Sequence, residues 1–151
     1  MVLKVLIVED NEYKRDKIAL CIENEFVGVE IFEAKSFTSG WKAILNLEFD
    51  LVCLDMSLPT VDKTSMDSGG ELRTFGGKEL AKKAIRRKLQ LNIVVLTQYK
   101  NFSHNSINYT FEKIKEEFIC DVGESCLGFL HYSNTSSQWK SELIQIIKEL
   151  T

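Results

Sequence analysis

Three apolar runs in the sequence end in side chains that can bind a cation or act as a nucleophile. Glu9 and Asp10 follow the run that starts at Leu3, Asp55 ends "DLVCLD", and Thr97 ends "NIVVLT". A carboxylate at the end of a buried strand is costly unless a partner compensates its charge. Asp55 could therefore be a turn residue, a metal ligand or a nucleophile.

Convergence of these side chains would create a site for a hard cation. In open α/β sheets, ligands bind beyond the carboxyl ends of the strands, near the point where the strand order reverses. Three carboxylates confined there repel one another and cannot all stay ionised without a cation. Mg²⁺ is such a cation, because it prefers oxygen ligands and keeps several waters. The alternative for a single acidic residue is a helix N-cap, and Asp10 precedes a predicted helix.

Apolar runs and segments of helical period alternate along the chain. We expect strands in "LKVLIVE", "VEIFEA", "DLVCLD", "NIVVLT" and "LGFLHY", which are mostly runs typical of strands covered on both faces. We expect helices in "NEYKRDKIALCIENEF", "SFTSGWKAILNL" (with Ser36 as N-cap), "GKELAKKAIRRKL", a segment from Phe111 to Ile119, and "SQWKSELIQIIKEL". This alternation predicts an α/β fold in which a parallel sheet lies between layers of helices.

Size and composition indicate one ordinary globular domain. The 151 residues suit a single domain spanning 1–151, with a long polar loop at 60–76 and an enlarged segment at 100–126. The net charge of −3 is too small to favour nucleic acid or a membrane as a direct partner. The four cysteines show no Cys-x-x-Cys spacing, which favours free thiols in a reducing cytoplasm. We therefore expect a cytoplasmic protein.

Three segments resemble the signature motifs of response-regulator receiver domains in bacterial two-component signalling. They are "VLIVEDNEYKRDKI", "FDLVCLDMSLP" and "IVVLTQY". The resemblance matches Glu9 and Asp10 to the family's acidic pair, Asp55 to its phosphoacceptor and Thr97 to its switch hydroxyl. Pro59 stands at the family's position four residues after the phosphoacceptor. Taken together, the three motifs are fairly specific, whereas any one alone would be weak.

The resemblance implies a fold as well as a site. It is strong from Met1 to about Tyr99, apart from the loop at 60–76, and weak from there until the last helix. It implies a flavodoxin-like, doubly wound, five-stranded parallel sheet with helices on both faces. It also implies a signalling domain that accepts a phosphoryl group on its own aspartate, and not an enzyme that turns over a substrate.

The mechanism implied by the resemblance starts with transfer of a phosphoryl group to Asp55 from a histidine kinase or a phosphotransfer protein. Thr97 would then turn toward the phosphoryl group, Phe129 would follow, and a protein-binding surface would change. Mg²⁺ would offset the charge of the transferring group. Its implied ligands are Asp10, Asp55 and the main-chain carbonyl of Ser57, with Glu9 acting through water.

The chain departs from the family pattern in two respects. Receivers carry a lysine at the end of strand five that pairs with the phosphoryl group, and here that position is Tyr132. No nearby residue is expected to replace it, with Lys100 the closest candidate. The loop after Pro59 and the stretch from Thr97 to Tyr132 are each longer than usual by roughly a dozen residues. The second stretch is expected to replace the surface, formed by helix four and strand five, that receivers present to partners.

Other functional classes fit the sequence less well. A haloacid-dehalogenase-type phosphatase needs an acidic residue two positions after its nucleophile, where this chain has Ser57. In "LRTFGGKE", Leu72 and Glu79 occupy positions where a P-loop requires a glycine and a hydroxyl. The remaining rival is a pseudo-receiver, an interaction module that keeps the acidic pocket but whose binding does not depend on phosphorylation. The missing lysine favours this rival, and the intact acidic residues with Thr97 favour phosphorylation.

Overall fold

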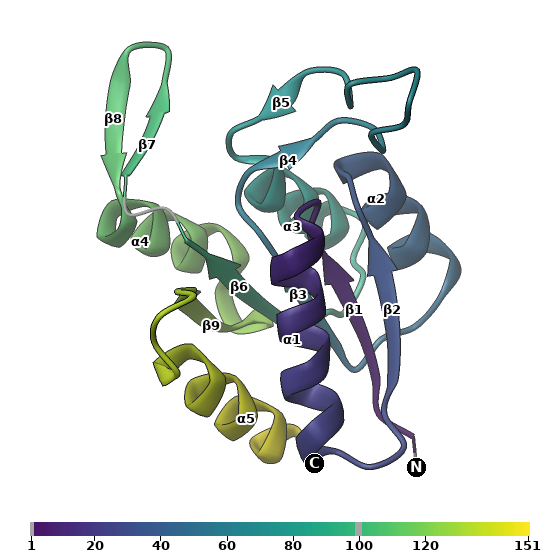
Figure 1. Ribbon diagram of the computed structural model, residues 1–151. Helices are drawn as coiled ribbons and strands as arrows, with labels where there is room; N and C mark the ends of the chain where they lie inside the picture. The colour runs from purple at the N-terminus through teal and green to yellow at the C-terminus, as the bar shows by residue number, and fades with distance from the viewer. Residues whose placement is uncertain (1, 99–100) are drawn as a thin grey trace.

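The sheet at the centre of the molecule is parallel throughout. The computed structural model describes residues 2–98 and 101–151, and Figure 1 shows how its elements are arranged. In spatial order the five strands are β2 (Glu30–Ala34), β1 (Lys4–Val8), β3 (Leu51–Leu54), β6 (Ile93–Thr97) and β9 (Cys126–His131). All neighbouring pairs run parallel. This is the strand order of a flavodoxin-like, doubly wound sheet, so the predicted fold class is confirmed.

Helices cover both faces of the sheet, which explains why its strands are apolar without alternation. The helices α1 (Glu12–Glu25) and α5 (Gln138–Leu150) pack on one face, and α2 (Phe37–Asn46), α3 (Gly76–Arg86) and α4 (Phe111–Val122) on the other. A single 3-10 turn, η1 (Gly123–Ser125), follows α4. In β1, Leu6 faces the three-helix layer and Ile7 the two-helix layer, and both are fully buried. No helix in the described part of the chain is both long and apolar enough to cross a membrane.

Side-chain caps fix the starts of the first two helices. Asn11 is the N-cap of α1, and its side chain accepts a hydrogen bond from the Lys14 N–H at 2.9 Å. Ser36 caps α2 within a capping box, as predicted. Because Asn11 caps α1, the alternative that Asp10 is the N-cap of this helix is wrong.

Both long insertions extend from the edge of the sheet where the parallel strands end (Figure 1). The predicted loop at 60–76 folds back on itself, because β4 (Leu58–Pro59) pairs antiparallel with β5 (Leu72–Arg73). The second insertion contains an unpredicted hairpin, β7 (Asn101–His104) and β8 (Ile107–Thr110). Its two turn residues, Asn105 and Ser106, have φ of 51° and 65°, as a tight hairpin turn requires. Phe75, at the start of α3, contacts the ring of Tyr109 on this hairpin.

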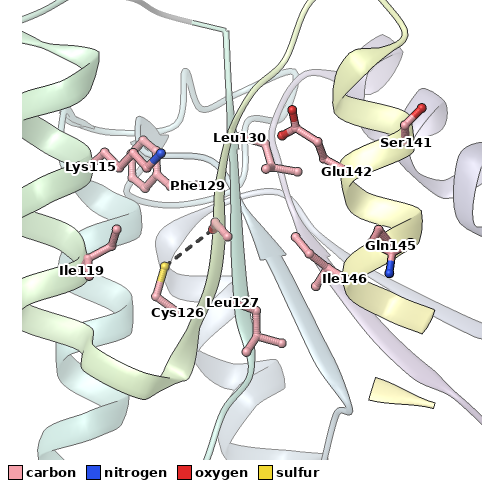
Figure 2. Close-up of a pocket in the computed structure, with 11 residues that line it drawn as sticks. Lys115, Ile119, Cys126, Leu127, Phe129, Leu130, Ser141, Glu142, Gln145 and Ile146 are labelled. Atoms are coloured by element: carbon pink, nitrogen blue, oxygen red, sulfur yellow. Dashed lines mark hydrogen bonds between the residues drawn. The ribbon is translucent and has the colours of Figure 1, made fainter. Parts of the chain in front are cut away.

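The second insertion leaves the α4–β9 surface in place. The hairpin precedes α4, and α4 still lies beside β9 in the manner of an ordinary βα unit. A groove of about 630 Å³ runs over β9 between α4 and α5, with Ile119, Leu127 and Ile146 among its lining residues (Figure 2). The expectation that the insertion replaces this surface is therefore wrong, because the extra residues are accommodated at the sheet edge.

Gly77 is required where α3 meets the end of β3. A Cβ at this position would lie 2.2 Å from the main-chain oxygen of Asp55 and 2.8 Å from Leu54 Cδ1. We predict that Gly77→Ala lowers the free energy of unfolding by roughly 1–3 kcal/mol, because the backbone must move to relieve this overlap. Urea denaturation followed by circular dichroism measures the change.

Gly28→Ala is the control for this prediction, because φ at Gly28 is +80° and nothing lies within 4 Å of an added Cβ. Its cost should be limited to backbone strain of about 1–2 kcal/mol. Equal stability of Gly77→Ala and the wild type would contradict the close approach of α3 to Asp55.

Candidate functional site

The ends of β1 and β3 open into one cavity at the carboxyl edge of the sheet. Its volume is about 450 Å³, and we call it the acidic cavity because it is lined by Glu9, Asp10, Asp55 and Ser57. These are the four predicted metal-binding residues. The β4–β5 insertion adds Lys63 to the wall, and the second insertion adds Ser103. The structure therefore brings the predicted acidic residues together and surrounds them with residues of both insertions.

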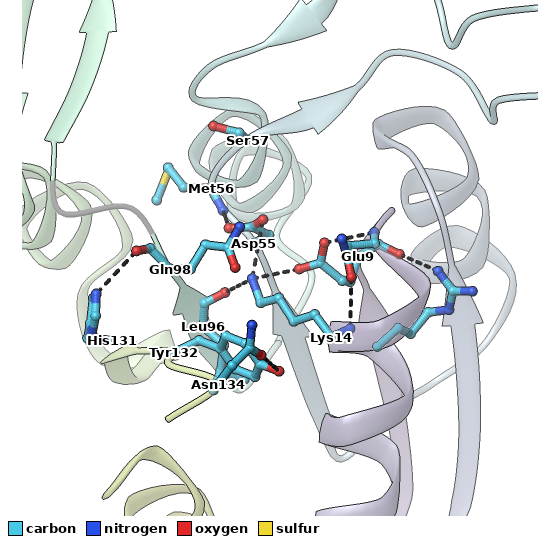
Figure 3. A network of polar contacts seen from close by, with 12 residues as sticks. Glu9, Lys14, Asp55, Met56, Ser57, Leu96, Gln98, His131, Tyr132 and Asn134 are labelled. Atoms are coloured by element: carbon cyan, nitrogen blue, oxygen red, sulfur yellow. Dashed lines mark hydrogen bonds and ion pairs between the residues drawn. The ribbon is translucent and has the colours of Figure 1, made fainter. Parts of the chain in front are cut away.

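A lysine from α1 lies between two of the carboxylates (Figure 3). The Nζ atom of Lys14 is 2.6 Å from Glu9 Oε1 and 3.3 Å from Asp55 Oδ2. It also donates a hydrogen bond of 2.6 Å to the main-chain oxygen of Leu96, next to the end of β6. Only 3% of the Lys14 side chain is exposed. The compensating charge that Asp55 requires is thus supplied by the protein itself.

Of the two carboxylates that share Lys14, Glu9 has the less favourable surroundings for a charge. Its Oε1 contacts the ammonium as an ion pair without hydrogen-bonding geometry, and its Oε2 accepts the Asn11 N–H at 3.0 Å. Burial and the nearby charge of Asp55 together raise the pKa of Glu9 to about 7, against the lowering effect of Lys14. One ammonium does not fully compensate two buried carboxylates.

Asp55 and Asp10 differ in their surroundings. Asp55 is almost fully buried, and its Oδ1 accepts the N–H of Met56 at 2.7 Å. Asp10 faces the β4–β5 insertion, where its Oδ2 lies 3.1 Å from Lys63 Nζ. The Ser57 hydroxyl donates to the main-chain oxygen of Thr74 at 3.0 Å. Among the described residues, no group of three His, Cys, Asp or Glu side chains forms a ready-made metal cluster.

The two predicted switch residues are both buried. Thr97 is fully buried at the end of β6, and its Oγ1 has no hydrogen-bond partner among the described residues. A buried hydroxyl without a partner is destabilising, so Thr97 is suited to accept or donate a bond when a new polar group arrives. Phe129 packs against Phe111 and Phe118 of α4, with ring centroids 5.1 and 5.6 Å apart.

Tyr132, which the family resemblance places at the position of the receiver lysine, is buried. Tyr132 donates its hydroxyl to Asn134 Oδ1 at 2.9 Å, and its N–H to the Thr97 oxygen at 2.9 Å. Its ring centroid lies 5.4 Å from Lys14 Nζ. Lys100, the predicted candidate for a substitute cation, lies outside the described residues. Lys14, the cation that α1 brings to within 3.3 Å of Asp55 Oδ2, was not identified from the sequence.

A signal for Lys14 was present in the sequence. Lys14 precedes Ile18 by four residues and Ile22 by eight, so it belongs to the apolar stripe of α1. Arg15 is also buried, and its Nη1 donates to the Glu9 main-chain oxygen at 2.9 Å. The position of Lys14 on this stripe indicates that its side chain starts near the sheet, and the packing of α1 decides where its amine lies.

The arrangement has the parts that a carboxylate nucleophile needs. A buried carboxylate faces a cavity, an ammonium lies beside it, and a second and third carboxylate line the same wall. Carboxylate and carbonyl oxygens are also ligands suited to Mg²⁺. The residue two positions after Asp55 is Ser57, which lacks the acidic group that a haloacid-dehalogenase-type phosphatase needs there.

Known proteins similar to this chain include a response regulatory protein and receiver domains. The Detocs response regulatory protein DtcB of Enterobacter cloacae is 31% identical over 150 residues, covering 98% of this chain and 100% of that protein. A CheY-like receiver domain of Methanospirillum hungatei superposes with a TM-score of 0.66 at 21% identity, covering 99% and 93% of the two chains. No protein-family model matches the chain.

A third similar protein is known with a metal ion. The receiver domain of the sensor histidine kinase PA1611 of Pseudomonas aeruginosa has a magnesium ion coordinated in its active-site cleft. It superposes with a TM-score of 0.64 at 15% identity, covering 99% of this chain and 98% of that one.

The sharing of one ammonium by two carboxylates predicts the effect of Asp55→Asn in metal-free buffer. The variant should be more stable than the wild type at pH 7, because Lys14 and Glu9 then form a neutral pair. It should also lower the pKa of Glu9 toward its usual value of 4.5. In the wild type, the raised pKa means that the unfolded chain loses its Glu9 proton first, so Glu9 reduces stability as pH rises from 4.5 to 7.

The stability difference should therefore widen by roughly 1–3 kcal/mol across that window. Chemical denaturation in EDTA at several pH values measures it. Asp50→Asn, at the opposite end of β3, is the control, because Asp50 is bonded to the Lys4 N–H and lies outside the acidic cavity. A variant less stable than the wild type across this range would show that Lys14 fully compensates both carboxylates.

Proposed function

This chain belongs to the response-regulator receiver family, and we propose that Asp55 is its phosphoacceptor. The observation that carries the proposal is the position of Asp55, whose carboxylate ends β3 and faces the acidic cavity beside an ammonium. Buried ionisable groups that have a charge partner and face a cleft are concentrated at functional sites. Phosphorylation would serve two-component signalling, with a histidine kinase or a phosphotransfer protein as donor.

In the proposed reaction, an oxygen of Asp55 attacks the phosphorus of a phosphohistidine. The new O–P bond forms while the P–N bond breaks, and the electron pair of that bond stays on the imidazole nitrogen, which takes up a proton from water. Asp55 is held for this attack, since Met56 N–H fixes its Oδ1 at 2.7 Å. The product is an acyl phosphate that carries more negative charge than the carboxylate it replaces.

The residues of the acidic cavity suit Mg²⁺ as the cofactor. The donor set consists of hard oxygens, and Mg²⁺ is bound in other sites through only one or two carboxylates with waters. Asp10 and Asp55, with the Ser57 main-chain oxygen and Glu9 through water, would hold it. When bound, Mg²⁺ would neutralise charge on the transferring group. Asp10 is at present paired with Lys63, so binding requires Lys63 to leave.

Thr97 and Phe129 would carry the response outward. The unpartnered Thr97 Oγ1 gains a hydrogen bond if it reaches a phosphoryl oxygen. Thr97 pairs with His131 across β6 and β9, two residues after Phe129, so a movement there is passed to β9. The groove between α4 and α5 runs over this strand and is the surface that would change.

A pseudo-receiver remains the second candidate, and one observation favours it. Lys14 and Lys63 already pair with all three carboxylates of the acidic cavity, so the site is compensated without a metal or a phosphoryl group. In that case the groove would bind its partner whatever the state of Asp55.

The first test is direct detection of the modification. Wild-type protein incubated with acetyl phosphate and Mg²⁺ should gain one phosphoryl group in intact-protein mass spectra, and Asp55→Asn should not, because its amide is not a nucleophile. Asp50→Asn, at the other end of β3, should be modified like the wild type. Absence of the adduct in the wild type under these conditions would support the pseudo-receiver.

The Lys63–Asp10 pair predicts a change in metal affinity. Lys63→Met should bind Mg²⁺ more tightly by roughly two- to fivefold, the range for losing a partly exposed ion pair that competes for Asp10. Lys148→Met, an equal change of charge on α5, should leave the affinity unchanged. Isothermal titration calorimetry measures both, and weaker binding by Lys63→Met would mean that Lys63 supports the metal site.

A further inference from the structure

We propose that Lys14 contacts the phosphoryl group on Asp55. Helix α1 would then supply the cation that other receivers supply from the fifth strand of the sheet, which is β9 in this chain. This inference rests on the proposed function of Asp55 and adds a residue to it. Lys14 lies within the first of the quoted motifs, but the family resemblance assigns it no role, and its proposed role follows from where the fold places its amine.

The first argument is the position of the amine. Lys14 Nζ lies 3.3 Å from Asp55 Oδ2, and among the described residues Lys14 forms the one ion pair with Asp55. A phosphoryl group bonded to that carboxylate lies within reach of a small rotation of the lysine chain. Lys63, the lysine that lines the acidic cavity, pairs with Asp10.

The second argument is the state of the family position. Tyr132 is 2% exposed and cannot offer a positive charge, and its ring contacts Lys14 as a cation–π partner. The ring therefore fills the space beside the amine and keeps it dry.

The third argument is charge. A single buried ammonium pairs with two carboxylates, Glu9 and Asp55, so the charges of this network are unequal. Phosphorylation adds further negative charge at Asp55, so the ammonium gains more from Asp55 than it did before. A cation that binds the phosphoryl group must interact more strongly with Asp55 after the modification than before. A purely structural ion pair has no such requirement.

The same amine also connects the site to the switch strand. Lys14 Nζ holds the main-chain oxygen of Leu96, which directly precedes Thr97. If Lys14 turns toward the phosphoryl group, this bond weakens and the end of β6 is released next to the unpartnered Thr97 hydroxyl. Lys14 thereby links the charge at Asp55 to the position of Thr97 through one hydrogen bond.

The test uses beryllofluoride with Mg²⁺, which mimics the acyl phosphate, and follows amide chemical shifts during a titration of the full chain. Lys14→Met should weaken beryllofluoride binding by roughly ten- to hundredfold, the effect of losing one charge-assisted hydrogen bond. Lys17→Met should bind as the wild type does, because Lys17 lies one turn further along α1 with its amine over Tyr13. The double variant Lys14→Met/Tyr132→Lys should recover binding, because it returns a lysine to the family position.

Equal binding by folded Lys14→Met and the wild type would overturn the inference and leave phosphorylation of Asp55 intact. If the wild type shows no shifts even at Asp55, the proposed function fails and the inference with it.

A second measurement needs no variant and covers the case in which Lys14→Met does not fold. In wild-type protein, the ¹⁵Nζ signal of Lys14 should shift on addition of beryllofluoride, while that of Lys17 should not. An unchanged Lys14 signal in the presence of shifts at Asp55 would assign Lys14 a structural role only.

Discussion

One ammonium group shared by two buried carboxylates is the interaction on which this site depends. Lys14 lies between Glu9 and Asp55, and each of these side chains is almost inaccessible to water. Charges so placed interact strongly: loss of Lys14 would leave two buried carboxylates without a cation, whereas loss of one carboxylate would leave a neutral pair. The ends of β1 and β3 can carry buried carboxylates because Lys14, on the first turn of α1, pairs with both of them. The helix cap at Asn11 helps fix that turn.

The sheet and the acidic residues could be predicted from the sequence because both follow from chain direction. Each central strand is buried on both faces, so its run of apolar residues identifies it. Glu9 and Asp55 directly follow such runs, and parallel strands end at a common edge. Lys14 could not be predicted with the same reasoning. A lysine on an apolar stripe can also extend its amine to solvent, and only the packing of α1 on the sheet decides that it reaches Leu96 instead.

The insertions could be recognised from the sequence as long but not described as structure. Residues 101–110 have no continuous apolar run, and the turn of the hairpin lacks the glycine that usually indicates one. The predicted loop at 60–76 is closed by two short strands that pair over only two positions each. Both insertions are positioned by contacts at the edge of the sheet, one of which is the contact between the rings of Phe75 and Tyr109. As a result, residues from both of them line the acidic cavity.

The most direct test of this account is a crystal structure of the protein with beryllofluoride and Mg²⁺. The account predicts the adduct on Asp55, Lys14 Nζ within hydrogen-bonding distance of one of its fluorine atoms, and Lys63 displaced from Asp10 by the metal. A structure in which Asp55 carries the adduct while Lys14 remains bound only to Glu9 and Leu96 would contradict it.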